Sequence, residues 1–268
     1  MAMQPLRVVV AGAGGRMGRA LCAGIATDAR LVLAAALDVP GSPAVGETVG
    51  AVRVDTDIEA AVAAGDVLID FTRPAGTLAH LAACARHGVA AVVGTTGLDG
   101  AQKDVLRGYA RTVPIVFAAN TSVGVTVLLC LVEQAARALG PGFDIEVVEM
   151  HHRHKVDAPS GTALRLGEAA AAGLDTTLAA AGVYARHGDT GERKPGTIGF
   201  AALRGGDVVG EHVVVFAGEG ERVEIAHRAT SRQLFVAGAL RAALFVGDRR
   251  AQGTAGLFDM PDVLGLAR

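Results

Sequence analysis

Titratable side chains concentrate in one short stretch of an otherwise apolar, Ala- and Gly-rich chain, from Glu149 to Lys155. The stretch contains three histidines, an arginine and a lysine, and a turn-forming Ala-Pro-Ser-Gly-Thr sequence soon follows and leads into a helical pattern. Histidine exchanges protons near neutral pH, and the free amides at a helix N-terminus bind anions. These residue types in this order predict a site that binds an anion and transfers protons.

Three interpretations compete for His151, His152 and His154. In the first they ligate a metal, but Arg153 and Lys155 would repel a dication, and no HExxH or cysteine pattern accompanies them. In the second the stretch is a solvated charged loop with no function. In the third the histidines donate protons and Lys155 neutralises a carboxylate. We expect the third, and no metal.

The residues that follow the histidines favour this interpretation. Pro159 ends an extended segment, and Ser160 can cap the next helix. The amides of Gly161 and Thr162 are then available to an incoming carboxylate. Asp157 is expected to orient the loop or pair with Lys155 rather than to react. The other histidines occur singly, and no functional role is expected for them: His80, His87, His187, His212 and His227.

A second candidate site lies near the N-terminus, where a glycine-rich turn from Gly12 to Gly18 joins an apolar strand to a helix. Glycines there let the backbone bend and let a pyrophosphate approach the helix N-terminus. Asp38 stands twenty positions beyond Gly18, at the end of the next strand, where a carboxylate takes the ribose hydroxyls of the adenosine half. A tight glycine turn without a ligand is the alternative, but strand, helix and acid all stand where dinucleotide binding requires them.

Further polar residues follow the ends of the next strands, and ligands of doubly wound sheets lie outside the carboxyl ends of strands. Residues 70–74, which include Arg73, close the third strand, and residues 94–97 close the fourth. Thr95 and Thr96 are there either to line the cofactor or as ordinary turn residues. Residues 118–121 close the fifth strand, where Asn120 serves either the nicotinamide amide or the cap of the following helix.

The elements that must position these residues differ between the two halves of the chain. In the first half, short apolar runs alternate with helical patterns, which predicts an α/β fold with a Rossmann-like, doubly wound parallel sheet. We expect strands at 6–11, 31–37, 67–71, 90–94 and 114–117, and helices at 16–26, 58–64, 77–86 and 101–110.

In the second half, a long apolar helix at 123–139 and an alternating strand at 143–149 precede the helix that Ser160 opens. Strands at 198–204, 207–217 and 221–229, joined by glycine turns, then predict a second α+β domain with a mixed or antiparallel sheet. An apolar helix at 234–245 can pack back on the first domain. The predicted division is therefore 1–122 with 233–268, and 123–232.

Composition excludes several classes of protein. Apolar residues make up 51% of the 268 and charged residues 19%, which is typical of a globular chain. The net charge of −2 and the 4% aromatic content disfavour nucleic-acid binding, and no predicted segment is long enough to span a membrane. Three scattered cysteines without a pairing pattern indicate reduced thiols in a cytoplasmic protein: Cys22, Cys84 and Cys130.

Taken in order, the glycine loop, Asp70-Phe-Thr-Arg-Pro74, Gly94-Thr-Thr-Gly97 and the stretch from His151 to Thr162 closely resemble the 4-hydroxy-tetrahydrodipicolinate reductase family of lysine and diaminopimelate biosynthesis. The resemblance runs essentially from end to end. It implies reduction of a cyclic dicarboxylate by NADH or NADPH with loss of water. It also implies a homotetramer built by the second domain, which binds the substrate, while the first domain binds the dinucleotide.

The resemblance also implies a role for each motif residue. His151 and Lys155 match the family's proton-donating pair, and His152 with the Gly161 and Thr162 amides matches its substrate contacts, with Ser160 beside them. The residues that match its cofactor contacts are Gly12, Ala13, Gly14, Gly15, Arg16, Met17, Asp38, Gly94, Thr95, Thr96, Ala118, Ala119, Asn120 and Thr121, and Arg73 joins them.

One departure from the family pattern concerns the choice of cofactor. Many members carry an arginine after the ribose-binding acid, suited to the 2′-phosphate of NADPH, but here Val39 follows Asp38. An acid without an adjacent cation favours the free 2′-hydroxyl of NADH, although Arg16 and Arg73 could still admit NADPH. A second departure is Thr121, where some relatives have an aromatic residue beside the nicotinamide.

Two other classes of protein share the predicted fold. One is another nicotinamide oxidoreductase of amino-acid metabolism, such as an aspartate or homoserine dehydrogenase, which the dense His-Lys motif disfavours. The other is a dinucleotide sensor without catalysis, which would have little use for His151 and Lys155 together.

Overall fold

The structure, a computed structural model, describes residues 4–266 and divides the chain into two compact units. Unit 1 comprises the chain up to Val123 and again from Gln233, and unit 2 comprises Gly124–Arg232. Residues 1–3 and 267–268, which the predicted division of the sequence includes, lie outside the described residues.

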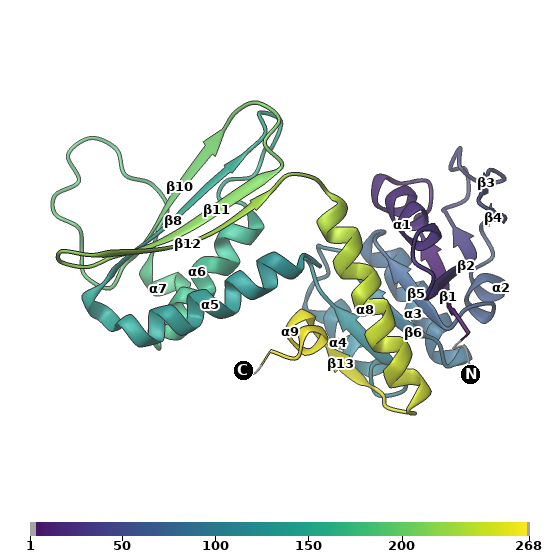
Figure 1. The fold of residues 1–268 in the computed structure, drawn as a ribbon. Helices are drawn as coiled ribbons and strands as arrows, with labels where there is room; N and C mark the ends of the chain where they lie inside the picture. The colour runs from purple at the N-terminus through teal and green to yellow at the C-terminus, as the bar shows by residue number, and fades with distance from the viewer. Residues whose placement is uncertain (1–3, 267–268) are drawn as a thin grey trace. The chain divides into compact units, whose positions relative to one another are not determined.

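Unit 1 is built on an eight-stranded sheet with the strand order β13-β7-β6-β5-β1-β2-β4-β3 (Figure 1). All neighbouring strands are parallel except β3 and β4. The strands are β1 Leu6–Ala11, β2 Leu31–Leu37, β3 Thr48–Val49, β4 Val52–Asp55, β5 Val67–Asp70, β6 Ala90–Val93, β7 Pro114–Phe117 and β13 Gly256–Phe258. The helices are α1 Arg16–Ala26, α2 Ile58–Ala63, α3 Pro74–His87, α4 Gly100–Tyr109, α8 Gln233–Ala251 and α9 Met260–Leu264.

Helices cover both faces of this sheet, because successive side chains of a buried strand point to opposite faces. Val8 and Val10 of β1 belong to one core with residues of α1, α8 and α9. Val9 and Ala11 belong to a second core with residues of α2, α3 and α4. The parallel order brings the carboxyl ends of β1, β2, β5, β6 and β7 to one edge, which is where the predicted cofactor residues follow.

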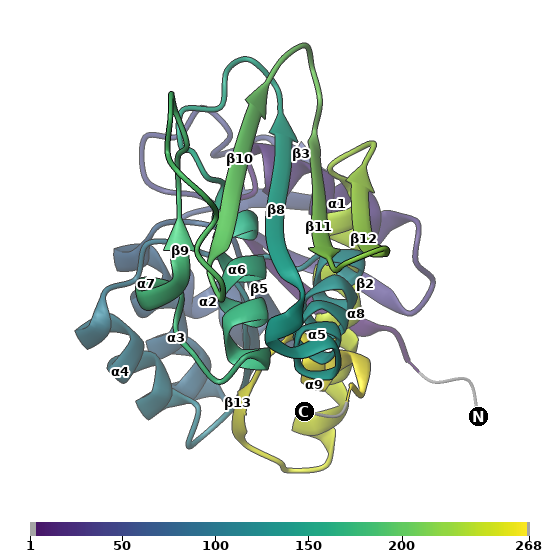
Figure 2. The same ribbon diagram turned by 90° about the vertical axis from the view of Figure 1, so that its left-hand side faces the viewer.

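Unit 2 is built on a five-stranded mixed sheet with the order β12-β11-β8-β10-β9, which Figure 2 shows from one side. Strand β8 is parallel to β10 and antiparallel to β11. The strands are β8 Asp144–His151, β9 Gly182–Val183, β10 Ile198–Arg204, β11 Gly210–Ala217 and β12 Arg222–Ala229. The helices are α5 Val123–Leu139, the 3₁₀ turn η1 Gly140–Gly142, α6 Gly161–Gly173 and α7 Leu178–Ala181.

The helices of unit 2 lie on one face of its sheet (Figure 1). Ile145, Val147 and Phe216 of that face form a core with residues of α5, α6 and α7. The opposite face carries exposed or half-buried apolar side chains, at Val148, Met150, Ala201, Leu203, Val213 and Ala226.

The α/β fold class is confirmed, and the second sheet proves to be mixed because β10 runs parallel to β8. The expectation that no segment is long enough to span a membrane was wrong as a statement of length. Residues Val123–Gly142 form a 20-residue helical segment that is apolar enough to cross one. Leu128, Val132 and Ala136 of this segment are buried in the unit 2 core, so packing in that core accounts for the apolar character of these positions.

Candidate functional site

A cavity of about 670 Å³ opens in unit 1 at the ends of β1, β2 and β5. Its lining includes Gly12 and Gly15 of the glycine loop, together with Asp38, Arg73 and His80. Four of these five are predicted cofactor residues, and sequence reasoning had assigned no role to the fifth. A crevice outside the carboxyl ends of parallel strands is where dinucleotides bind in doubly wound sheets.

The glycine loop and Asp38 touch each other directly. The Asp38 carboxylate accepts a hydrogen bond from the Gly14 amide at 2.9 Å through Oδ2 and one from the Val39 amide at 2.8 Å through Oδ1. A Cβ at Gly14 would lie 2.5 Å from Asp38 Oδ2 and 2.5 Å from Ala44 Cβ, and a Cβ at Gly18 would overlap the Gly12 carbonyl. Gly14 therefore has no room for a side chain beside Asp38 and Ala44, and Gly18 has none beside the Gly12 backbone.

A buried carboxylate, Asp70 at the end of β5, organises one wall of the cavity. It accepts hydrogen bonds from the Thr72 amide at 2.8 Å, the Thr72 hydroxyl at 2.6 Å and the Thr95 hydroxyl at 3.2 Å. His80 Nδ1 lies 2.8 Å from Asp70 Oδ2. Thr77 joins the network through a 2.8 Å hydrogen bond to Thr95.

His80, for which the sequence predicted no functional role, is part of this network through its contact with Asp70. His80 lies two turns into α3, the helix that follows β5, and the end of β5 lies at the crevice. This position in the sequence was the signal that could have identified it. Thr95 is 2% exposed, so its hydroxyl belongs to the Asp70 network, and any contact with a cofactor is left to its backbone.

The remaining predicted cofactor residues follow β6 and β7, at Gly94–Thr96 and Ala118–Thr121, and do not line this cavity. The Asn120 side chain accepts a hydrogen bond from the Ser122 amide at 2.9 Å, just before α5 begins at Val123. The Thr121 hydroxyl donates to the Phe235 carbonyl at 2.7 Å and so fastens the start of α8. Ala13, Arg16 and Met17 continue the glycine loop into α1.

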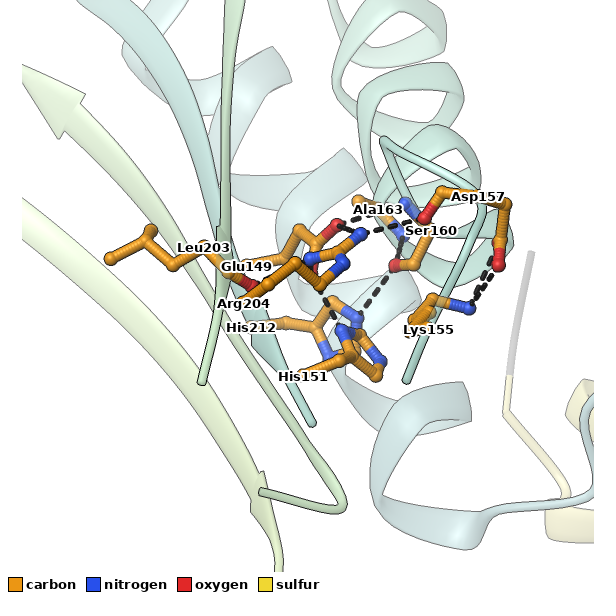
Figure 3. Close-up of polar contacts among 9 residues, drawn as sticks. All are labelled: Glu149, His151, Lys155, Asp157, Ser160, Ala163, Leu203, Arg204 and His212. Atoms are coloured by element: carbon orange, nitrogen blue, oxygen red, sulfur yellow. Dashed lines mark hydrogen bonds and ion pairs between the residues drawn. The ribbon is translucent and has the colours of Figure 1, made fainter. Parts of the chain in front are cut away.

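The histidine stretch begins on β8, which ends at His151, and runs through a loop to Ser160, the N-cap of α6 (Figure 3). Glu149, 1% exposed, lies at its centre. Its carboxylate accepts two hydrogen bonds of 2.8 Å from the Arg204 guanidinium, one of 3.0 Å from the Ser160 amide and one of 2.6 Å involving His151 Nδ1. Burial alone raises the pKa of Glu149, but these hydrogen bonds outweigh it and lower that pKa.

His212 of β11 stands directly opposite Glu149 in the sheet and contradicts its interpretation as an isolated histidine. Its Nε2 lies 3.1 Å from the Ser160 hydroxyl, and its ring meets that of His151 edge to face at 5.2 Å between centroids. Burial, followed by the neighbouring His151, lowers the pKa of His212 to about 4. Among the described residues, no hydrogen-bond partner lies near its buried Nδ1.

Lys155 and Asp157 form the predicted pair. The Lys155 ammonium lies 2.8 Å from each Asp157 carboxylate oxygen, and it lowers the pKa of that carboxyl (Figure 3). His152 is half-buried, and its buried Nδ1 has no partner among the described residues. Arg153 and His154 are exposed.

The N-terminus of α6 has the geometry expected of a carboxylate site. The Ser160 hydroxyl accepts a hydrogen bond from the Ala163 amide at 3.2 Å and so caps the helix. Gly161 and Thr162 supply the first-turn amides, and nothing lies within 4 Å of where a Cβ would stand at Gly161. Space for an anion and the positive end of the helix dipole coincide here.

Sequence reasoning did not assign three members of this site, Glu149, Arg204 and His212. Arg204 and His212 come from β10 and β11, more than fifty residues beyond Glu149, so only the sheet register brings them together. Within residues 4–266, no group of three or more His, Cys, Asp or Glu side chains is arranged to hold a metal ion.

Comparison with known proteins matches both parts of the chain to one family. The family model described as dihydrodipicolinate reductase, N-terminus, matches residues 6–121, and the one described as dihydrodipicolinate reductase, C-terminus, matches residues 124–264. The chain is 54% identical to the 4-hydroxy-tetrahydrodipicolinate reductase of Cupriavidus necator, over 97% of this chain and all of the relative. It is 55% identical to that of Laribacter hongkongensis, over 98% of this chain and all of the relative.

A solved structure supports the same fold. The dipicolinate-bound dihydrodipicolinate reductase of Paenisporosarcina sp. TG-14 superposes with a TM-score of 0.77 at 24% identity, covering 95% of this chain and 97% of that one. The resemblance inferred from the motifs is therefore confirmed, and the chain belongs to the dihydrodipicolinate reductase family.

Proposed function

We propose that this chain reduces 4-hydroxy-tetrahydrodipicolinate to tetrahydrodipicolinate with loss of water, in the biosynthesis of lysine and diaminopimelate. Full-length relatives at 54% and 55% identity carry the name of that activity, and the family is one of NAD(P)H-dependent oxidoreductases. The observation that carries the proposal is that His151, Lys155 and the capped N-terminus of α6 belong to the same unit of such a chain.

The residues of unit 1 fit a nicotinamide dinucleotide. Gly14 and Gly18 stand where a Cβ would collide with Asp38 or the Gly12 carbonyl, and the cavity opens at the ends of parallel strands. We assign the loop from Gly12 to Met17 to the pyrophosphate, Asp38 to the ribose and Arg73 to the cavity wall. The residues after β6 and β7 complete the assigned set, at Gly94–Thr96 and Ala118–Thr121. When bound, the nicotinamide supplies the hydride.

The Asp38 carboxylate supports a preference for NADH over NADPH. Both of its oxygens accept backbone amides, and the residue after it, Val39, is 63% exposed and uncharged. A 2′-phosphate would meet this carboxylate, although Arg73 lines the same cavity and Arg16 begins α1 directly after the glycine loop. The expected ratio of kcat/KM for NADH over NADPH is above about 10, which corresponds to about 1.4 kcal/mol of discrimination. Comparable kcat/KM values would contradict the preference.

We assign unit 2 to the dicarboxylate substrate. The first-turn amides at Gly161 and Thr162, the Ser160 cap and the half-buried His152 ring offer donors to its carboxylates. His151 and Lys155 are the assigned proton donors, because a nearby acid must supply the proton that accompanies hydride addition. A structural relative is described as dipicolinate-bound, which supports a ligand of this class.

We further propose that unit 2 assembles a homotetramer through its uncovered sheet face, in a cytoplasmic protein. The face presents exposed or half-buried apolar side chains from four strands, together with the charged Glu146, Glu211, Glu224 and Arg228. Exposed apolar side chains on a sheet face that no helix covers are typical of interfaces between copies. The proposed division of labour places dinucleotide binding in residues 1–122 with 233–268, and substrate binding and assembly in residues 123–232.

A substrate panel tests the reaction. The condensation product of pyruvate and aspartate semialdehyde is generated in situ, and loss of reduced nicotinamide absorbance is followed beside aspartate semialdehyde alone and homoserine with the oxidised cofactor. Turnover confined to the condensation product is expected. Turnover of either other substrate would favour a different dehydrogenase, and nucleotide binding without any turnover would favour a sensor.

A further inference from the structure

We propose that Glu149 is a positioning residue that fixes His151 as the Nδ1–H tautomer, and that the same carboxylate locks the N-terminus of α6 against it. This inference rests on the proposed function, in which His151 transfers a proton and α6 binds a substrate carboxylate. It joins those two tasks through one buried side chain.

The hydrogen bonds of Glu149 divide evenly between its two oxygens. Oε2 bonds His151 Nδ1 at 2.6 Å and Arg204 Nη1 at 2.8 Å. Oε1 accepts from the Ser160 amide at 3.0 Å and from Arg204 Nη2 at 2.8 Å. An ionised carboxylate has about four acceptor sites and no donor, so this set of partners saturates it. Against an ionised carboxylate, His151 Nδ1 must be the donor.

The charge state of Glu149 follows from its surroundings. At 1% exposure it is shielded from water, and a buried carboxylate stays ionised only where a counter-charge and hydrogen bonds hold it. Arg204 supplies the counter-charge in a bidentate pair, and the pKa of Glu149 is lowered despite burial. Arg204 Nη2 also donates to the Asp157 carbonyl at 2.6 Å, which ties the loop carrying Lys155 to the same centre.

With Nδ1 committed to Glu149, the proton that His151 exchanges must be at Nε2. Gly210 packs beside this nitrogen, and because a Cβ at that position would lie only 3.0 Å from Nε2, the glycine keeps a side chain away from it. His212 stands edge-on to the ring, and its lowered pKa of about 4 keeps it neutral near pH 7, so it adds no competing positive charge. Glu149, held by Arg204, therefore fixes the Nδ1 side of the His151 ring, and Gly210 leaves the Nε2 side without a neighbouring side chain from that position.

The wild-type protein provides the first test. Solid-state ¹⁵N NMR of histidine-labelled protein, with the His151 signals assigned by comparison with a His151→Gln sample, distinguishes protonated from unprotonated ring nitrogens. The proposal requires a protonated Nδ1 and an unprotonated Nε2 when the ring is neutral. The opposite tautomer would overturn it, whether or not any variant folds and whether or not the substrate is correct.

Glu149→Gln provides the second test, because glutamine keeps the shape but replaces one acceptor oxygen by a donor. We expect kcat to fall by about 10²- to 10⁴-fold, the range for losing a correctly poised acid–base group, with the affinity for NADH unchanged. The His151 ¹⁵N pattern should change as well. A merely structural role would leave that pattern and the kcat near wild type once the protein is folded.

Glu146→Gln is the matched control, because Glu146 is also an arginine-bound carboxylate of β8, paired with Arg186 and Arg193, but points to the opposite face. It should keep kcat within about 3-fold of wild type and retain the native ¹⁵N pattern. Equal losses in the Glu149 and Glu146 variants would overturn the proposal. A wild type that binds NADH but reduces none of the condensation product would instead refute the proposed function, while the tautomer measurement would still decide the role of Glu149.

Discussion

At the scale of single residues, burial in unit 2 strongly lowers the pKa of His212 on β11. His212 is 4% exposed, and its pKa is lowered to about 4 from an ordinary value of 6.5. In the unfolded chain the same ring takes up a proton at higher pH than it does in the native protein. The unfolded state therefore binds more protons between about pH 4 and 6.5, and the free energy of unfolding must fall as pH falls through that interval.

The contribution of His212 can be isolated by substitution. Relative to His212→Gln, the wild type should lose up to about 3 kcal/mol of stability from pH 6.5 down to pH 4. Urea denaturation midpoints across this range measure the effect. His187→Gln replaces an exposed histidine and should follow the wild type closely. Parallel pH profiles for the wild type and His212→Gln would contradict the assignment.

Residue-scale prediction from sequence succeeded where chemistry is contiguous in the chain. Pairing with Lys155 was one of the two roles expected for Asp157, and Ser160 was identified as able to cap the next helix. The structure contains both the pair and the cap. His212 could not be assigned from the sequence because its partners, Glu149 and Ser160, lie more than fifty residues before it. His80 lies only ten residues beyond Asp70, in the helix that follows the strand. Its pairing with Asp70 was missed because only the residues at the strand ends were considered as candidates.

At the scale of elements, the glycine loop makes a specific prediction about cofactor binding. A Cβ at Gly14 would displace Asp38 or Ala44, since it would lie 2.5 Å from each. Gly14→Ala should therefore weaken NADH binding by at least about 10-fold, or about 1.4 kcal/mol, while the protein stays folded. Isothermal titration of NADH measures the change.

The matched control for this substitution is Gly100→Ala in α4. Nothing lies within 4 Å of its added Cβ, and alanine is the better helix former. Its dissociation constant for NADH should equal that of the wild type. Unchanged NADH binding in Gly14→Ala would show that the loop does not cradle the cofactor as proposed.

Long elements were predictable because hydrophobic periodicity extends over their whole length. The strands predicted at 6–11 and 31–37 and the helix at 16–26 coincide with β1, β2 and α1. The elements that were missed are short, such as β3 at Thr48–Val49, β9 at Gly182–Val183 and α7 at Leu178–Ala181. Two to four residues cannot display a period, and tertiary pairing alone determines whether they count as strand or helix.

At the scale of the whole molecule, the open face of the unit 2 sheet makes a prediction about assembly. Leu203 is 45% exposed near the end of β10, opposite Met150 on that face. Leu203→Glu should dissociate the proposed homotetramer into smaller species, because a carboxylate would be buried without a partner in the interface. Light scattering coupled to size-exclusion chromatography gives the mass.

Val105→Glu supplies the control, because Val105 is also 45% exposed but lies on α4 in unit 1. It should leave the mass unchanged. A tetramer that persists in Leu203→Glu, or a wild type that is already monomeric, would contradict assembly through this face.

The net charge of −2 gives the chain little long-range attraction for anions, so capture of a dicarboxylate depends on the local amides and cations.

The central claim is that this chain performs proton-coupled reduction of a cyclic dicarboxylate with Lys155 as a proton donor. The most direct measurement follows NADH oxidation with the pyruvate–aspartate semialdehyde condensation product, for wild type and Lys155→Ala side by side, with NADH affinity determined for both. We predict turnover by the wild type, a fall in kcat of about 10²- to 10⁴-fold in the variant, and equal NADH affinity. Equal turnover by the two proteins, or none by a wild type that binds NADH, would contradict the claim.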